Sequence, residues 1–449
     1  MEADVDKRTI RRVIFASSLG TLFEWYDFYL YGSLAIFFGG LFFPPGNETA
    51  ALLASLATFG AGFGVRPLGA IVFGHVGDLV GRKYTFLITM ATMGMATALI
   101  GLLPTYESWG IAATVMLVLL RLLQGLALGG EYGGAATYVA EHVPDERRGY
   151  YTSFIQTTAT LGFFVSMGVI GSTRLGFGEA AFKAWGWRVP FLISFALLGV
   201  SLYVRVKMRE SPLFSRLKAA GKTSKNPLKE TFTSPLARRY VLVALFGATA
   251  GQGVVWYTGQ FYALTFLQTA LGLDWRTSYV LLSIALALTT PLFVYFGWLS
   301  DRIGRKRILL GGCALAALTY VPIYMAMAYL AGIDSTAARA GIVALLALQM
   351  VYVCMVYGPI AAFLVELFPT KIRYTSMSIP YHLGNGWFGG FLPLIATAVT
   401  TSVWAKTTFG AAAMYTGLIY PIGVCLVTLI VGGLFIHETK DHRMDADAA

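Results

Sequence analysis

The chain has 449 residues, of which 56% are hydrophobic and only 13% are charged, and its formal net charge is +11. A soluble domain has about 25% charged residues, so this composition excludes an ordinary soluble globular protein. Apolar runs of about 20 residues, each long enough to cross a bilayer as a helix, recur along the whole chain. We therefore predict an all-α polytopic membrane protein whose surroundings are the lipid bilayer.

The basic residues follow the pattern of a membrane protein rather than that of a nucleic-acid-binding protein. Most of the 34 Lys and Arg lie in alternate connections between apolar runs. By the positive-inside rule, this asymmetry places both termini in the cytoplasm, so we expect a multi-pass protein of the plasma (inner) membrane. The start, MEADVDKRTIRR, is a charged arm without the apolar core of a signal peptide. Cys313, Cys354 and Cys425 lie in apolar runs without metal-ligand spacing, so we predict no metal and no cofactor.

Twelve apolar segments are long enough to be transmembrane helices. In chain order they cover residues 12–40, 50–75, 84–104, 109–139, 150–172, 187–206, 239–268, 278–299, 308–330, 340–365, 375–400 and 411–436. The longest polar stretch separates the sixth segment from the seventh. We therefore predict an N-terminal six-helix bundle (1–206), a cytoplasmic linker (207–238) and a C-terminal six-helix bundle (239–449).

The two halves repeat one another. GHVGDLVGRK at 74–83 returns as GWLSDRIGRK at 297–306, and EHVPDERR at 141–148 returns as ELFPTKIR at 366–373. Both matches fall at the cytoplasmic ends of equivalent spans. Repeats of this length in a helical membrane protein are typical of two bundles that rock about a binding site at the membrane midplane.

These residues also carry a family resemblance. The loop motif at 74–83 and 297–306, and RLLQGLALGGE at 121–131, resemble those of the major facilitator superfamily. FEWYDFYLYG at 23–32 and VRPLGAIVFGHVGD at 65–78 resemble more narrowly the metabolite:proton symporters. The resemblance implies the major facilitator fold and proton-coupled symport of a small organic metabolite by alternating access. Members of that family carry citrate, 2-oxoglutarate, shikimate, or proline and betaine.

Five ionisable residues lie deep in the predicted N-terminal bundle: Glu24, Asp27, Arg66, Arg121 and Glu131. Glu24 and Asp27 share a helix face because residues three apart project the same way. Charges at this depth are costly and must be paired or neutralised, and three acids cannot all pair with two arginines. We predict that the surplus acid carries the transported proton, with Asp27, Glu24 and Glu131 as candidates. The alternative is a fixed ion-pair lattice that braces the bundle.

The C-terminal half has no acid at the matching depth, since the repeat places Gln252 opposite Asp27. We predict that the substrate is bound by Arg66 and Arg121 from the first half together with mainly neutral residues, namely Tyr26, Gln252, Trp256, Tyr257, Gln260, Tyr357, His382 and Asn385. For the aromatic residues ordinary packing is the alternative, and for His382 it is a hydrogen-bonded structural role.

The repeated loops predict a cytoplasmic gate. In the superfamily that this chain resembles, such loops hold the two bundles together when the transporter faces outward. The residues that we assign to the gate are Asp78, Arg82, Asp301, Arg305, Glu141 and Glu366. The alternative is that the basic residues only report topology.

Other functions are less compatible with the sequence. An ATP-driven pump would need a phosphate-binding loop. GKTS at 221–224 resembles the end of such a loop, but Arg216 stands where the first glycine is needed, so the sequence disfavours a pump of this kind. No nucleophile–base pair or HExxH cluster suggests an enzyme. Drug efflux on the same fold is favoured by the aromatics and disfavoured by two deep arginines. We expect a monomer that transports a small carboxylate, or a zwitterion such as proline or betaine held by cation–π contacts.

Overall fold

The computed structural model describes residues 7–80, 82–130, 132–206, 227–369 and 372–443, and the side chains of 7–13, 16–17, 74–80, 82–86, 204–206 and 227 are not described. Helices form nearly all of these ranges, and no strand occurs within them. Among the described residues, eight helices are long and apolar enough to cross a membrane, and a bent pair makes a ninth. The remaining crossings are broken, short or more polar.

The first half supplies six crossings, several of them built from two helices in line. They are α1 (Lys7–Ser33) with α2 (Ala35–Phe42), α3 (Glu48–Gly64) with α4 (Arg66–Val80), α5 (Arg82–Ile100), α7 (Ile111–Gly129) with α8 (Tyr132–Ala140), α9 (Arg148–Phe177) and α11 (Arg188–Val206). Short pieces connect them: α6 (Tyr106–Trp109), η1 (Asp145–Arg147), α10 (Glu179–Ala181) and η2 (Phe182–Gly186).

The second half supplies six more crossings, in which wider π-helical turns interrupt the α-helices. The first is α14 (Pro235–Ala244), η3 (Leu245–Thr249), α15 (Ala250–Tyr257), η4 (Thr258–Tyr262) and α16 (Ala263–Thr269). The others are α17 (Trp275–Thr289) with α18 (Pro291–Ile303), α19 (Arg305–Ala331), α20 (Thr336–Tyr357) with α21 (Ile360–Leu367), α22 (Arg373–Leu383) with η5 (Gly384–Gly390) and α23 (Leu392–Thr401), and η6 (Gly410–Leu418) with α25 (Ile419–Phe435). The twelve crossings match the twelve predicted segments.

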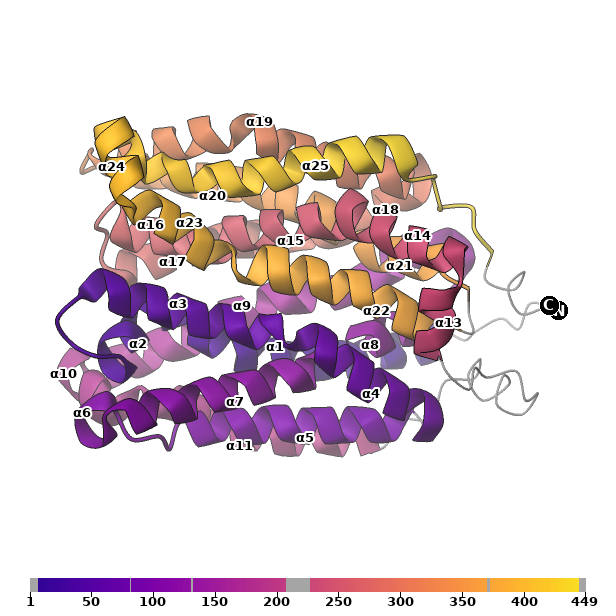
Figure 1. Ribbon diagram of the computed structural model, residues 1–449, viewed down its shortest axis with the longest axis horizontal. Helices are drawn as coiled ribbons and strands as arrows, with labels where there is room; N and C mark the ends of the chain where they lie inside the picture. The colour runs from indigo at the N-terminus through magenta and orange to yellow at the C-terminus, as the bar shows by residue number, and fades with distance from the viewer. Residues whose placement is uncertain (1–6, 81, 131, 207–226, 370–371, 444–449) are drawn as a thin grey trace.

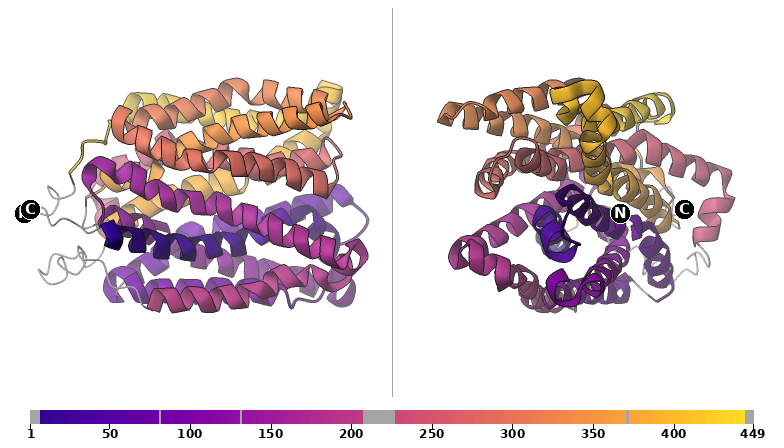
Figure 2. Two further views of the ribbon diagram at one scale, coloured as in Figure 1. Left: turned by 180° about the vertical axis from the view of Figure 1, so that it is seen from behind. Right: turned by 60° about the vertical axis from the view of Figure 1, so that its left-hand side comes forward.

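The two halves lie side by side along the long axis of the molecule (Figure 1). Helices of residues 7–206 occupy the lower part of that view and helices of residues 227–435 the upper part, and Figure 2 shows the same separation from two other directions. α1 begins and α25 ends at the same end of the molecule, called the terminal end below. α13 (Pro227–Thr233) also lies there, so part of the predicted linker is helical. α24 (Val403–Phe409) lies at the opposite end.

Several helix contacts join the halves, including α8 with α21 and α22. On one side α9 packs against α17 and α18, and on the other α3 and α4 pack against α22, η5 and α23. At the α9–α18 crossing, a side chain on Gly149 would lie 2.6 Å from the carbonyl oxygen of Gly297, and one on Gly297 would lie 2.6 Å from that of Gly149. Glycine is required at both positions because the two backbones touch, as small residues allow in membrane helices.

Candidate functional site

Arg66 is a buried cation at the break between α3 and α4. Helix α3 ends at Gly64 and α4 begins at Arg66, since Pro67 has no N–H with which to continue the α3 hydrogen-bond ladder. The side chain is fully buried, and none of its three guanidinium nitrogens has a hydrogen-bond partner among the described residues. The guanidinium carbon lies 4.9 Å from the ring centre of Phe63 and 5.1 Å from that of Trp25. Aromatic faces thus hold the cation while its five N–H donors remain unused.

Aromatic residues from both halves meet in front of this guanidinium. Tyr29 of α1 stacks on Trp256 of α15 at 5.2 Å, and Tyr257 lies edge-on to Phe63 at 5.1 Å. The Arg66 charge acts on the hydroxyls of four tyrosines and on one imidazole, belonging to Tyr29, Tyr257, Tyr357, Tyr381 and His382. All of these side chains are buried. The structure thus brings together Arg66 and four of the predicted substrate-binding residues: Trp256, Tyr257, Tyr357 and His382.

Asp27 lies in the first half and is also buried, with 5% of its surface exposed. Its Oδ1 accepts a hydrogen bond of 2.5 Å from the hydroxyl of Ser194 on α11. Among the described residues, no Lys, Arg or His nitrogen lies within ion-pair distance of this carboxylate. A buried acid whose partner is a neutral hydroxyl is suited to gaining and losing a proton, because no fixed cation holds it ionised.

Arg121 occupies a different and better satisfied place. Its Nη1 donates to Gln124 Oε1 at 2.6 Å and to the carbonyl oxygen of Phe28 at 3.3 Å. Gln124 in turn donates to Thr97 at 2.7 Å. The guanidinium also lies over the rings of Phe28 and Tyr31, at 4.2 and 4.6 Å. These contacts link α7 to α1 and, through Gln124, to α5, while Nε and Nη2 of Arg121 have no hydrogen-bond partner among the described residues.

The remaining predicted residues of the first half are placed as follows. Glu24 is buried on α1, one turn before Asp27. Glu131 lies outside the described residues. Tyr26 donates to the carbonyl oxygen of Pro190 at 2.8 Å, which turns it towards α11 and away from the second half.

In the second half the predicted amides bind other protein groups. Gln252 and Asn385 donate to each other at 3.1 and 2.8 Å, which joins α15 to η5. Gln260 crosses to the first half and donates to Thr160 at 3.1 Å. His382 is buried beside the backbone of Gly129, and neither its ring nitrogens nor the indole nitrogen of Trp256 has a side-chain hydrogen-bond partner among the described residues. His382 and Trp256 therefore offer polar atoms to a bound molecule, whereas the two paired amides already satisfy each other.

The end opposite the termini is closed by contacts between the halves. Tyr279 of α17 donates to the carbonyl oxygen of Ser33 at 2.6 Å, and the Arg174 guanidinium of α9 lies 4.3 Å from the ring of Trp275. Nothing in the repeated motifs pointed to these residues. An arginine near the outer end of one span and a tryptophan at the start of another are a weak signal, because such residues are common at membrane interfaces.

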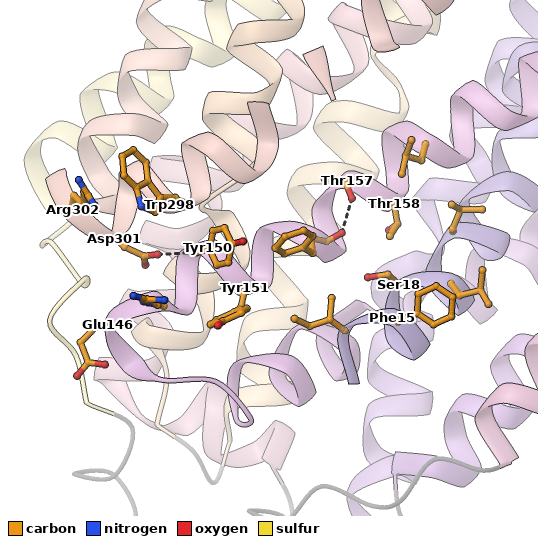
Figure 3. A pocket seen from close by; sticks show the side chains of 16 residues that line it. Phe15, Ser18, Glu146, Tyr150, Tyr151, Thr157, Thr158, Trp298, Asp301 and Arg302 are labelled. Atoms are coloured by element: carbon orange, nitrogen blue, oxygen red, sulfur yellow. Dashed lines mark hydrogen bonds between the residues drawn. The ribbon is translucent and has the colours of Figure 1, made fainter. Parts of the chain in front are cut away.

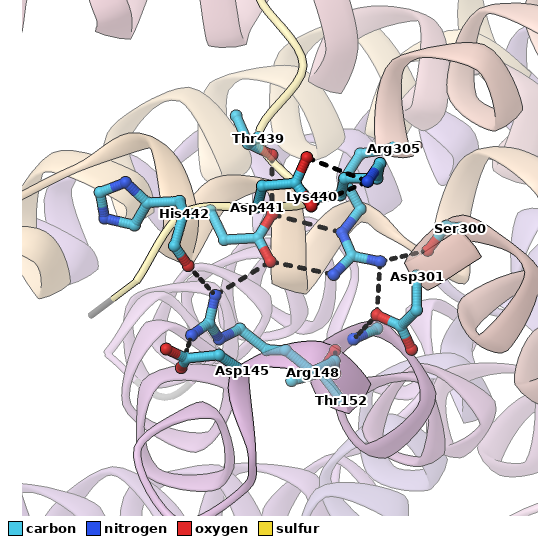
Figure 4. A network of polar contacts seen from close by, with 12 residues as sticks. Asp145, Arg148, Thr152, Ser300, Asp301, Arg305, Thr439, Lys440, Asp441 and His442 are labelled. Atoms are coloured by element: carbon cyan, nitrogen blue, oxygen red, sulfur yellow. Dashed lines mark hydrogen bonds and ion pairs between the residues drawn. The ribbon is translucent and has the colours of Figure 1, made fainter. Parts of the chain in front are cut away.

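The terminal end is closed by a network of buried ions, defined here as the Glu366 network: Asp145, Arg148, Asp301, Arg305, Glu366 and Thr439 (Figure 4). Glu366 Oε1 lies 3.0 Å from both Arg148 of the first half and Arg305 of the second. Asp301 pairs with Arg305 at 2.6 Å and accepts from the backbone N–H groups of Gly149 and Tyr150, each at 2.8 Å. Carboxylates from the second half thus bind the N-terminus of α9.

Three of the six predicted gate residues, Asp301, Arg305 and Glu366, belong to this network. The side chains of Asp78 and Arg82 lie outside the described residues. Glu141 follows α8, where its N–H donates to the carbonyl oxygen of Thr137. Arg148 was not predicted to belong to the gate, although its place in the repeated EHVPDERR motif was a signal that could have identified it. The segment after α25 was not predicted to take part either, yet Thr439 donates to Glu366 at 2.7 Å and the His442 carbonyl accepts from Arg148 at 3.3 Å.

Glu366→Gln is expected to open the terminal end. The substitution leaves Arg148 and Arg305 buried without their shared carboxylate, and breaking a buried pair in this way costs about 3–5 kcal/mol. We expect a lower melting temperature in detergent and a longer distance between spin labels at positions 146 and 238, measured by electron paramagnetic resonance. Glu107→Gln, at an exposed carboxylate of the opposite end, is the matched control. An unchanged label distance in Glu366→Gln would contradict a closing role.

A cavity of about 880 Å³ lies beside this network, between α1, α9 and α18 (Figure 3). Charged side chains, including Glu146, Asp301 and Arg302, line one end of it, and apolar groups such as Phe15 line the other. Phe15 is 68% exposed, as expected of a side chain that faces lipid. Because none of the aromatic residues around Arg66 lines it, this cavity is separate from the central site.

The chain is similar to a family model, to curated transport proteins and to a solved structure. The family model described as Major Facilitator Superfamily matches residues 18–380. The inner membrane metabolite transport protein YhjE of Escherichia coli (strain K12) is 36% identical over 440 residues, which cover 96% of this chain and 95% of that protein. A glycine betaine/proline/ectoine/pipecolic acid transporter of Dickeya dadantii (strain 3937) is 31% identical, covering 97% and 85%. The crystal structure of a D-xylose–proton symporter superposes with a TM-score of 0.71 at 18% identity, covering 97% of this chain and 99% of that one.

Proposed function

Because the chain belongs to the Major Facilitator Superfamily, we propose that it couples proton flow to the uptake of a small organic carboxylate. It is a multi-pass membrane transporter with the twelve-helix fold of that superfamily and is not an enzyme. One relative is named a metabolite transport protein, which supports the proposal of a metabolite:proton symporter.

One observation carries the substrate assignment: the guanidinium of Arg66 is buried, and none of its three nitrogens forms a hydrogen bond with a described residue. A carboxylate is the anion whose two oxygens match the paired N–H groups of arginine. The indole N–H of Trp256 and the ring nitrogens of His382 offer further polar groups in the same region. A single carboxylate on a small organic molecule would satisfy Arg66, while the aromatic rings of both halves would contact the rest of the molecule.

Proton coupling is assigned to Asp27. Asp27 is one of the deeply buried acids of the first half, and its described partner is the hydroxyl of Ser194. In a transport cycle this carboxyl group would be neutral while the site is closed and would release its proton when the site opens inward. Because the side chains of Asp27 and Arg66 both belong to the first half, movement of one bundle would affect both.

Alternating access would use the two closures already described. Breaking the Glu366 network would open the terminal end, and separating Tyr279 from Ser33 would open the other. Since basic residues crowd the connections at the terminal end, we assign that end to the cytoplasm.

Uptake into proteoliposomes tests this function directly. We expect a pH gradient, acidic outside, to drive accumulation of one or more members of a panel of mono-, di- and tricarboxylates. Collapsing the gradient with a protonophore is the control and should abolish accumulation. If no carboxylate, betaine or proline accumulates, the symport proposal is wrong.

Zwitterion uptake is the second candidate, and a specific observation favours it. One relative is named for transport of glycine betaine, proline, ectoine and pipecolic acid, and the stacked rings of Tyr29 and Trp256 could hold a cationic end by cation–π contacts. Both candidates place a carboxylate on Arg66. They are distinguished by whether betaine or a dicarboxylate competes more strongly for uptake of a common monocarboxylate.

A further inference from the structure

A second cavity, of about 700 Å³, lies at the terminal end and is not part of the transport site. The end of α18, the first turn of α19 and the segment that follows α25 enclose it. Its lining includes four basic side chains, Arg302, Lys306, Arg307 and Lys440, against the single carboxylate of Glu438. Lys440 pairs with Asp441 at 2.8 Å, and Lys306 donates to the carbonyl oxygens of Gly433 and Ile436. The excess positive charge of the cavity therefore lies on Arg302 and Arg307.

The one carboxylate in the cavity is already bound by the protein. Glu438 accepts from the backbone N–H groups of Arg305 and Lys306, at 2.7 and 3.2 Å, so it binds the N-terminus of α19. Arg302 lies over the ring of Trp298 at 4.0 Å. Neither Arg302 nor Arg307 forms an ion pair with a described residue. Two arginines thus remain available to an anion.

Exposed apolar side chains flank the cavity. Ile303 is 41% exposed, and Leu434 and Phe435 at the end of α25 are 71% and 47% exposed. On a transmembrane helix such side chains face lipid acyl chains, which places the basic cavity at the level where acyl chains give way to headgroups. A molecule with a phosphate at one end and acyl chains at the other fits both surfaces.

We propose that this cavity binds the phosphate-bearing headgroup of an anionic phospholipid. Basic pockets at the membrane surface attract anionic lipids, at about 1 kcal/mol for each Lys or Arg. Arg302 and Arg307 would bind the phosphate, and Ile303, Leu434 and Phe435 would contact the acyl chains. The proposal does not depend on which substrate is transported.

Bound lipid would also act on the closed terminal end. The segment after α25 forms one wall of the cavity through Ile436, His437, Glu438 and Lys440, and the same segment supplies Thr439 to the Glu366 network. A headgroup in the cavity would hold that segment in place and so stabilise the closure. The lipid is expected to favour the conformation described here over one that is open at the terminal end.

Lipid binding can be measured on the full chain in detergent by native mass spectrometry, with phosphatidylglycerol, phosphatidylcholine and glycerol 3-phosphate as separate probes. We expect phosphatidylglycerol to bind most tightly. The double variant R302Q/R307Q should weaken its binding by about thirtyfold, since two basic contacts are lost at about 1 kcal/mol each. R238Q/R239Q, which neutralises two exposed arginines on α14 at the same end, is the matched control and should retain binding.

Three results would overturn the proposal. Equal weakening in R238Q/R239Q would mean that binding depends only on general positive charge at this end. Equal affinity for phosphatidylcholine would mean that anionic lipid is not selected. Glycerol 3-phosphate binding as tightly as phosphatidylglycerol would make the cavity a site for soluble anions. The melting temperature of R302Q/R307Q, expected to match that of the control, verifies that both variants are folded.

Discussion

Replacing Arg66 by methionine is expected to abolish uptake and, at the same time, to stabilise the protein. Uptake should fall by at least about a hundredfold, because two charge-assisted hydrogen bonds to the substrate carboxylate contribute about 1.5–3 kcal/mol each. The melting temperature should rise. An unpaired buried cation costs several kcal/mol, and replacing it by an apolar side chain removes that cost.

The opposite signs of these two effects make the test specific. Arg121 serves as the matched control because its guanidinium already binds Gln124 and the carbonyl oxygen of Phe28. Its Nε and Nη2 have no hydrogen-bond partner among the described residues, so Arg121→Met removes a buried cation together with the Nη1 hydrogen bonds and should raise the melting temperature less than Arg66→Met does. Arg66→Lys keeps the charge but loses the paired N–H groups, so we expect partial uptake. A fall in melting temperature for Arg66→Met would show that Arg66 is structural.

Asp27→Asn is expected to separate proton coupling from substrate movement. Asparagine has nearly the same shape as a protonated aspartate but cannot release a proton, so uptake driven by a pH gradient should be abolished. Counterflow exchange of labelled for unlabelled substrate needs no net proton movement and should remain within about threefold of the unmodified protein. Both are measured in proteoliposomes.

Two further variants guard against misreading the result of Asp27→Asn. Glu24→Gln tests the neighbouring acid on the same helix face and should retain accumulation. Ser194→Ala removes the hydroxyl that binds Asp27 and should shift the pH dependence of uptake without abolishing it. Full accumulation by Asp27→Asn would move the proton site elsewhere, with Glu24 next.

The twelve-helix fold could be predicted from the sequence because each feature that indicates it lies within a short stretch of the chain. Each apolar run predicts one crossing, and the repeated motifs at 74–83 and 297–306 indicate the duplication. Arg66 was identified as a candidate because a charge in an apolar run is costly wherever it lies. The sequence did not predict that this arginine would rest on Trp25 and Phe63 rather than pair with an acid, because that depends on helix rotation.

Contacts between distant segments were harder to predict. Gln252 was predicted to bind substrate, and the structure also pairs it with Asn385, 133 residues away, a contact that sequence spacing does not indicate. Arg148 was read only as part of a repeat, since its partner Glu366 lies in the other half of the chain. Sequence patterns indicate which residues are candidates for the functional site. The contacts of these residues depend on how the two halves pack, which the patterns do not show.

The polar contacts of the segment after α25 have a consequence for the biosynthesis of the protein. Arg148 lies in the first third of the chain, but its partners Glu366 and the His442 carbonyl come from the last fifth. During translation, therefore, α9 is synthesised before Glu366 and His442. Of the partners of Arg148 described here, Asp145 alone is then present. The terminal end can close completely only after Thr439 and His442 have been synthesised, so a chain truncated directly after α25 would complete its helices without completing this closure.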